Sequence, residues 1–172
     1  MSAAIDALVQ GSLVELFQAY GVAIAPMPRS GREATAKFPD ISVGISFTRE
    51  AATRKAGRLT LSLPSEVLGL MKAEGGTPLR QADWAREITN QLLGRVKNRL
   101  LQFSIKLQAG LPQSLEPKLL QEQIQTSTTL LAYAGRTLRG NVVVTLEGMP
   151  AESELVYVGP STVAQEGDTL FF

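Results

Sequence analysis

The sequence predicts an α/β (α+β) domain made of two related halves. The chain has 172 residues, of which 44% are hydrophobic and 19% charged, and this composition suits one compact domain with a sizeable core. Hydrophobic residues recur at helical spacing in some segments and alternate with small or polar residues in others. The order of helix, short strand ending in proline and strand pair occurs twice, with an offset of roughly 85 residues. We therefore expect two α/β halves that pack as one domain.

The first half is predicted to begin with a long helix and to end with a short one. We predict a helix at 3–19, an extended run at 22–25, strands at 41–47 and 58–63, and a short helix at 66–72. Gly21 is expected to end the first helix, and Pro26 to stop the extended run. Ser65 is expected to cap the short helix. Because the two strands alternate apolar with small or polar residues, we expect them to form a hairpin.

The second half is predicted to repeat this order after a flexible break at 73–77, AEGGT. We predict a helix at about 79–103, an extended run at 105–111, a short helix near 117–125, and strands at 128–134 and 141–147. Pro112 is expected to stop the extended run. The segment 135–140, which begins and ends with glycine, is expected to join the two strands into a second hairpin.

One face of the long helix is predicted to point away from the core. At roughly 100° per residue, the helix has an apolar face of Trp84, Ile88, Leu92, Val96, Leu100 and Phe103, and opposite it a polar face of Asp83, Glu87, Asn90, Gly94 and Lys97. Glu87 and Asn90 are neighbours on the helix surface because they are three residues apart. A glycine at an exposed mid-helix position costs about 1 kcal/mol relative to alanine. We therefore interpret Gly94 as a point of close approach, and the polar face as a docking and reaction surface.

The composition excludes several kinds of chemistry. The chain has no cysteine and no histidine, so it has no thiolate nucleophile, no Ser-His pair and almost no possibility of a zinc site. Catalysis would have to use carboxylates, amides, hydroxyls, lysine or arginine. A net charge of +1 does not indicate a nucleic-acid partner. No apolar run approaches the roughly 20 residues of a membrane span, and the N-terminus lacks the basic region of a leader. We expect a cytoplasmic protein that binds neither nucleic acid nor membrane.

A short pattern on the polar face resembles that of a known family. Glu87, Asn90 and Gly94 form the pattern E-x2-N-x3-G, with Asp83 before it and Pro112 after it. This arrangement resembles the signature of the CheC, CheX and FliY chemotaxis phosphatases, and the likeness is sharper to CheX. The resemblance implies a CheC/CheX-like fold of two pseudo-symmetric halves, in which an antiparallel sheet packs against two main helices. Because the first half has no counterpart of Glu87 and Asn90, we expect one site per chain.

The resemblance also suggests how the chain is organised. It implies a CheX-like phosphatase domain at 1–147, followed by a C-terminal extension at 148–172 that packs on the same domain. Two apolar runs in the extension, at 155–158 and 169–172, can add strands or cover a dimer surface. CheX-like relatives with one motif per chain are dimeric, so we expect a homodimer that forms through sheet surfaces or edges and leaves the polar face free.

The function implied by the resemblance is removal of phosphate from the phosphoaspartate of a response-regulator receiver domain of the CheY kind. In this family an asparagine orients the attacking water and an acidic residue pairs with the receiver's lysine, and these roles fall on Asn90 and Glu87. Asp83, Gly94 and Lys97 would contact the partner. The chain needs no cofactor of its own, and Mg²⁺ is expected on the receiver. Phosphoryl transfer depends mainly on positioning and electrostatics, so the absence of a strong nucleophile is no obstacle.

One alternative of a different class has the same fold. The chain can be a non-catalytic CheX-like module that binds a signalling protein or serves as a subunit interface. Arg95, where the family often has a small polar residue, and the long C-terminal extension favour this alternative. The intact pair of Glu87 and Asn90 favours the enzyme.

Overall fold

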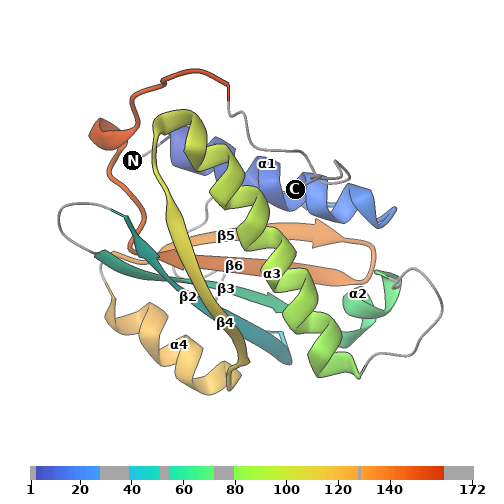
Figure 1. Cartoon of the computed structure of the whole chain (residues 1–172). Coiled ribbons are helices and arrows are strands. Elements are labelled where there is room, and N and C mark those ends of the chain that lie inside the picture. The colour runs from blue at the N-terminus through green and yellow to red at the C-terminus, as the bar shows by residue number, and fades with distance from the viewer. Residues whose placement is uncertain (1–2, 28–38, 51–54, 72–79, 128, 161–172) are drawn as a thin grey trace, which may run out of the picture.

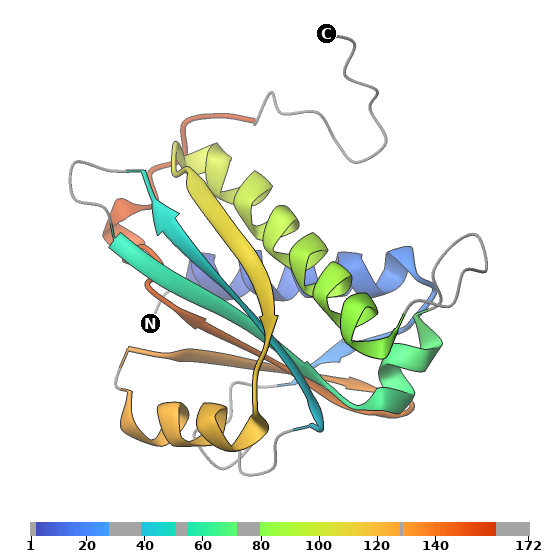
Figure 2. The ribbon, with the colours of Figure 1, turned by 60° about the horizontal axis from the view of Figure 1, so that its bottom comes forward.

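A computed structural model describes residues 3–27, 39–50, 55–71, 80–127 and 129–160. In these residues a six-stranded sheet separates two helical layers, with the two longest helices on one face and a shorter helix on the other (Figures 1 and 2). Every pair of neighbouring strands is antiparallel. The predicted fold class, an antiparallel sheet packed against two main helices, is therefore confirmed.

The elements follow the predicted order, with small shifts in their bounds. The helices are α1 (Ala3–Ala19), α2 (Ser65–Leu70), α3 (Gln81–Leu100) and α4 (Pro117–Thr126), and 3-10 turns lie at Leu101–Phe103 and Glu152–Glu154. The strands are β1 (Ala25–Pro26), β2 (Ile41–Arg49), β3 (Lys55–Leu63), β4 (Leu107–Ser114), β5 (Leu131–Thr137) and β6 (Gly140–Glu147). The predicted break at 73–77 lies outside the described residues.

The order of strands shows how the two halves are joined. Across the sheet the order is β1-β5-β6-β3-β2-β4. The last strand of each half, β3 or β6, lies at the centre, and the two pair with each other. The first strand of each half pairs outside its own half, since β1 pairs with β5 and β4 pairs with β2. The halves are thus pseudo-symmetric and exchange their edge strands, which makes them one domain.

The core lies between the sheet and the layer formed by α1 and α3. Helix α3 lies against β2 and β4 and also contacts α1. The fully buried residues of α3 include Ile88, Leu92, Val96 and Leu100, which were predicted for its apolar face. Fully burying one such side chain contributes about 1.5–3 kcal/mol. Burial of this face fixes the rotation of α3 about its axis, and this rotation turns the opposite face outward.

Two prolines take part in strands, and only one of them ends its strand. Pro26 pairs with Gly135 as the last residue of β1, and Pro112 pairs with Ile45 within β4. The prediction that Pro26 ends its extended run was confirmed, whereas the prediction that Pro112 ends its run was wrong, because β4 continues to Ser114. Both β1 and β4 are edge strands, and a proline without an N–H is tolerated where that side of the strand has no partner.

Gly135 was predicted to be part of a connection but lies within β5. A Cβ atom at this position would lie 2.5 Å from Cδ1 of Ile24, so the close packing of the segment before β1 requires a glycine here. Only Leu138 and Arg139 separate β5 from β6. The predicted hairpin is present, but its connection is two residues long, whereas the prediction gave 135–140 as the connection.

The short helix α2 begins differently from the prediction. Pro64 is its N-cap, and Ser65 is the first helical residue, so the predicted Ser65 cap was wrong. Instead, the backbone N–H of Ser65 donates to Oδ1 of Asp40 at 3.3 Å. Pro64 has the extended backbone that the N-cap position needs but no side-chain acceptor, and the carboxylate of Asp40, just before β2, accepts the hydrogen bond in its place.

The described part of the C-terminal extension contacts the rest of the chain. The N–H of Val158 donates to the carbonyl oxygen of Gln102 at 2.8 Å. The rings of Phe103 and Tyr157 meet edge to face with centroids 6.2 Å apart, and Leu155 packs against the core. Residues 155–158 form no strand. The run at 169–172 lies outside the described residues, so the division at 147 and the homodimer stay predictions.

Candidate functional site

The structure places the predicted site residues along one outward face of α3. Asp83, Glu87 and Asn90 are exposed, and Gly94 and Lys97 are partly exposed. Asp83 has a partner on its own helix, because Nη1 of Arg86 donates to its Oδ1 at 3.0 Å. An aspartate in the first turn also suits the positive end of the helix dipole. The predicted residues thus form one polar surface along α3.

Glu87 is oriented by a chain of hydrogen bonds that the sequence did not reveal. Nε2 of Gln91 donates to Oε1 of Glu87 at 2.9 Å. The hydroxyl of Tyr20, at the end of α1, donates to Oε1 of Gln91 at 2.8 Å. The Gln91 amide thus links the carboxylate to a residue of the neighbouring helix. The spacing of Glu87 and Gln91 could have suggested the first bond, but nothing in the sequence pairs Tyr20 with α3.

Trp84 holds this end of the helix in position. Its indole N–H donates to the carbonyl oxygen of Met71, the residue that follows α2. Its ring meets the ring of Tyr20 edge to face, with centroids 5.5 Å apart and an interplanar angle of 86°. Trp84 was predicted for the apolar face, and it packs at the margin of the core. It therefore fixes both the start of α3 and the tyrosine that supports Gln91.

The side chain of Asn90 has no hydrogen-bond partner among the described residues, whereas Glu87 does. Its amide can donate through nitrogen and accept through oxygen, and both groups face solvent. One turn further along, a Cβ atom at Gly94 would meet nothing within 4 Å. Internal packing therefore does not require this glycine. An unengaged amide beside an open stretch of helix is suited to contact with a second molecule.

The corresponding face of α1 is engaged within the protein. By the internal repeat, Asp6 occupies roughly the position in α1 that Asn90 occupies in α3. Asp6 is only partly exposed, and the hydroxyl of Tyr133 on β5 donates to its Oδ1 at 2.7 Å. The polar residue of the first half thus ties α1 to the sheet. The arrangement at Glu87 and Asn90 has no equivalent there.

Two general findings concern the part of the chain that the structure describes. No group of three or more histidine, cysteine, aspartate or glutamate residues is arranged to hold a metal ion within these ranges. No helix in the same ranges has both the length and the apolar character needed to cross a bilayer.

Comparison with known proteins relates this chain to others by structure. No protein-family model matches the sequence, and no curated protein matches it. A CheC-like superfamily protein from Shewanella sp. PV-4 has a TM-score of 0.64 and 14% identity, and the match covers 85% of this chain and 97% of that one.

Two further similar structures are CheX proteins. CheX from Desulfovibrio desulfuricans matches with a TM-score of 0.63 and 14% identity over 83% of this chain and 97% of that one. CheX from Borrelia burgdorferi, solved in a complex with CheY, BeF₃ and Mg²⁺, matches with a TM-score of 0.53 and 10% identity over 83% and 94%. At these identities the likeness concerns the fold, and it agrees with the resemblance seen in the sequence. The chain has the fold of the CheX and CheC-like chemotaxis proteins.

Proposed function

We propose that this protein dephosphorylates the phosphoaspartate of a CheY-like receiver domain and that α3 is its docking helix. The observation that carries the proposal is the polar face of α3, where an oriented carboxylate lies beside an unengaged amide. Glu87 is held by Gln91, and Asn90 has no partner among the described residues. The structure of Borrelia burgdorferi CheX with CheY supports a partner of this kind.

Each residue of the polar face has a role in the proposed reaction. Asn90 inserts into the receiver's active site and orients a water molecule for in-line attack on phosphorus. Glu87 pairs with the receiver's active-site lysine. Gly94 allows the receiver to approach the backbone of α3, and Asp83 and Lys97 contact the partner at the two ends of the face. Mg²⁺ is held by the receiver and neutralises charge on the phosphoryl group, so this chain needs no cofactor of its own.

The geometry is consistent with a reaction that needs positioning more than strong acid-base groups. The two residues lie on a helix whose apolar face is buried, so their backbone positions are set before the partner arrives, and Gln91 also orients the carboxylate of Glu87. Preorganisation of this kind lowers the cost of aligning water with the phosphoryl group. The helix therefore supplies orientation, and the receiver supplies the metal and the covalent phosphate.

The alternative function is a non-catalytic binding or interface module in a signalling complex. Arg95, partly exposed and next to Gly94, is the observation that favours it, since a long cationic side chain follows the point of close approach. In this alternative the same face of α3 binds a partner without accelerating loss of phosphate. Both functions use the same docking surface. They differ in whether this chain accelerates loss of phosphate from the receiver.

We expect the purified protein to accelerate dephosphorylation of at least one Mg²⁺-loaded receiver from its own genome. A panel of phosphorylated receivers is incubated with and without the protein, and loss of phosphate is followed over time. No covalent phosphoprotein intermediate should form on this chain, because it contributes no nucleophile. If every receiver decays at its intrinsic rate, the enzyme assignment fails. Binding to a beryllofluoride-activated receiver without acceleration would instead support the alternative.

Glu87→Ala is expected to weaken receiver binding and to lower the rate as well. A hydrogen bond to a charged group is worth about 1.5–3 kcal/mol, so affinity should fall roughly 10-fold or more. Equilibrium binding to a beryllofluoride-activated receiver measures the effect. Glu122→Ala is the matched control, because it removes one exposed carboxylate from α4 on the other face of the sheet. Equal binding by the two variants would rule out the lysine-pairing role of Glu87.

A further inference from the structure

Tyr20, Gln91 and Glu87 form a relay of hydrogen bonds whose direction is set by the chemistry of its members. A carboxylate oxygen can only accept, so the amide nitrogen of Gln91 must face Glu87, to which it donates at 2.9 Å. The amide oxygen therefore faces Tyr20, and the tyrosine hydroxyl donates to it at 2.8 Å. Donation into the amide oxygen polarises the amide and strengthens the bond that its N–H makes. The relay thus runs from the end of α1 to the carboxylate of Glu87.

The relay can orient Glu87 only if its far end is fixed. Glutamine has about as much rotamer freedom as glutamate, so a glutamine alone would be a weak support for the carboxylate. Surface pairs four residues apart on one helix contribute little stability for the same reason. A group outside α3 must hold the amide of Gln91, and the hydroxyl of Tyr20 is in that position.

The backbone of Tyr20 is fixed by the turn that ends α1. The N–H of Gly21 donates to the carbonyl oxygen of Gln18, and the N–H of Val22 donates to that of Phe17, each at 2.9 Å. With Gly21 at a φ of +70°, this is the Schellman arrangement that ends many helices. Phe17 and Val22 are both buried, which suits the hydrophobic contact that accompanies this motif. Tyr20 lies inside this turn, so its backbone cannot swing away from α3.

The ring of Tyr20 is held as well as its backbone. It is partly buried and packs against the core, and its edge-to-face partner is Trp84 of α3. The indole N–H of Trp84 is in turn bonded to the carbonyl oxygen of Met71. The tyrosine hydroxyl therefore reaches Gln91 from a position that the packing of α1 against α3 determines.

We propose that Tyr20 and Gln91 are positioning residues for receiver docking, so that the first half of the chain supports the site carried by the second. This inference rests on the proposed pairing of Glu87 with the receiver's lysine. Gln91 occupies Oε1 of Glu87, and Oε2 has no hydrogen bond to any described residue, which leaves it to accept from the lysine ammonium. Ordering a long side chain on binding lowers affinity, and the relay orders Glu87 before the receiver arrives.

Tyr20→Phe and Gln91→Met test the two steps of the relay. The first removes only a hydroxyl and keeps the ring that meets Trp84, and the second keeps the length of the side chain without its amide. Each should weaken binding of a beryllofluoride-activated receiver about threefold to tenfold, the penalty for ordering one long side chain on binding. Equilibrium binding measures the loss, and thermal unfolding checks the fold. Wild-type affinity in both variants would overturn the positioning role and leave the proposed function intact.

A double-substitution cycle separates positioning from a general structural role. If the relay acts through Glu87, Tyr20→Phe should cost no further receiver affinity when Glu87→Ala is already present. An equal loss in both backgrounds would mean that Tyr20 supports the fold and not the carboxylate, and this result would also overturn the proposal.

NMR relaxation of the Glu87 side chain tests the relay without a receiver. In the free wild-type protein this side chain should be ordered, and it should become more mobile in Tyr20→Phe, although the substituted residue lies outside α3. Equal mobility in the two proteins would show that Tyr20 does not position Glu87. If the wild type binds no receiver, the proposed function fails, and this comparison still decides whether the relay orients the carboxylate.

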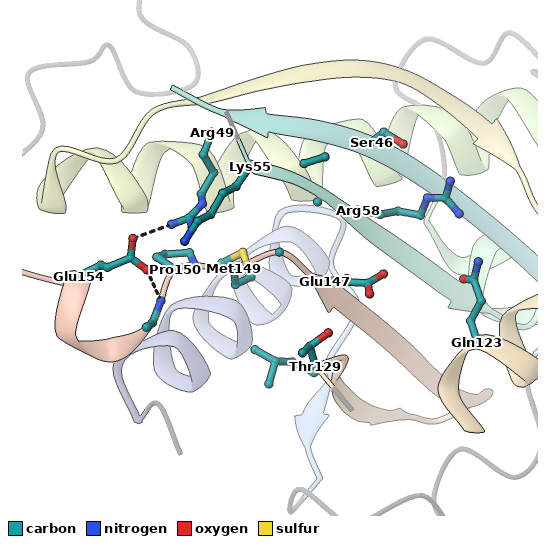
Figure 3. Close-up of a pocket in the computed structure, with 15 residues that line it drawn as sticks. Ser46, Arg49, Lys55, Arg58, Gln123, Thr129, Glu147, Met149, Pro150 and Glu154 are labelled. Carbon is teal, nitrogen blue, oxygen red and sulfur yellow. Dashed lines mark hydrogen bonds and ion pairs between the residues drawn. The ribbon is translucent and has the colours of Figure 1, made fainter. Parts of the chain in front are cut away.

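Two control substitutions remove the same groups elsewhere. Tyr133→Phe removes a hydroxyl that donates to Oδ1 of Asp6 at 2.7 Å. Gln123→Met removes an exposed amide from α4, on the other face of the sheet from α3 (Figures 2 and 3). Both variants should bind the receiver as the wild type does. A loss in either control as large as that in Tyr20→Phe would indicate a general effect of the substitution and would count against the relay.

Discussion

Asn90→Ala is expected to lower the single-turnover rate of receiver dephosphorylation by about 100-fold or more, because misplacing a reacting group by a small distance has effects of this size. Affinity for a beryllofluoride-activated receiver should change by no more than about twofold. An amide that orients water contributes mainly in the transition state, so its loss lowers turnover without a matching loss of binding. Single-turnover kinetics and equilibrium binding on the same variant separate these two quantities.

A matched control for this variant lies on the same helix. Asn98→Ala removes an exposed amide two turns after Asn90, and it should leave turnover unchanged. Circular dichroism checks that both variants remain folded. If Asn90→Ala keeps wild-type turnover with the fold intact, the water-positioning role is wrong even if the phosphatase assignment survives. If affinity and rate fall together, Asn90 acts in docking.

Gly94→Leu is expected to abolish docking while leaving the protein at least as stable as the wild type. A Cβ at this position meets nothing within the protein, so the leucine would project into the space that a partner needs. Helix propensity favours leucine over glycine by somewhat under 1 kcal/mol, which should raise the free energy of unfolding. Affinity for the receiver should fall by at least roughly 100-fold, equivalent to about 2.7 kcal/mol. Denaturant titration measures the rise in the free energy of unfolding, and equilibrium binding measures the fall in affinity for the receiver.

Two further substitutions calibrate this result. Gly94→Ala adds one methyl group and should weaken docking less than leucine does. Gln125→Leu adds a leucine at an exposed position of α4, across the sheet from α3, and should leave receiver binding unchanged. Wild-type affinity in Gly94→Leu would mean that the receiver does not approach this part of the helix. A comparable loss in Gln125→Leu would point to a general effect of added apolar surface.

Local patterns in the sequence were enough to predict the helix that carries the candidate site. The period of apolar residues in α3 is a property of neighbouring positions, and one face is buried as predicted. The exposure of Glu87 and Asn90 follows from the same period. Their proposed chemical roles come from the family resemblance, because such roles depend on the groups that a partner presents. The repeated element order likewise anticipated the pseudo-symmetric fold.

Features that depend on distant contacts could not be predicted in this way. Whether Pro112 can lie within a strand depends on the position of that strand at the sheet edge, which only the full topology reveals. The support of Gln91 by Tyr20 joins residues 71 positions apart. The ion pair of Arg49 with Glu154 joins residues 105 positions apart, and neither belongs to a recognisable motif. In each case the deciding neighbour comes from another part of the chain.

The exchange of edge strands has a consequence for folding cooperativity. Among the described residues, β1 pairs only with a strand of the second half and β4 only with a strand of the first, so neither half completes its part of the sheet alone. Local opening of one half would therefore remove a strand partner from the other, which couples their stabilities and favours a single all-or-none transition. Strand pairing between the two halves also slows folding, because the chain loses the entropy of closing a long loop before it gains the stabilising contacts. The helix bearing Glu87 and Asn90 is thus supported by the stability of the whole domain, and loss of either half would remove its rigid base.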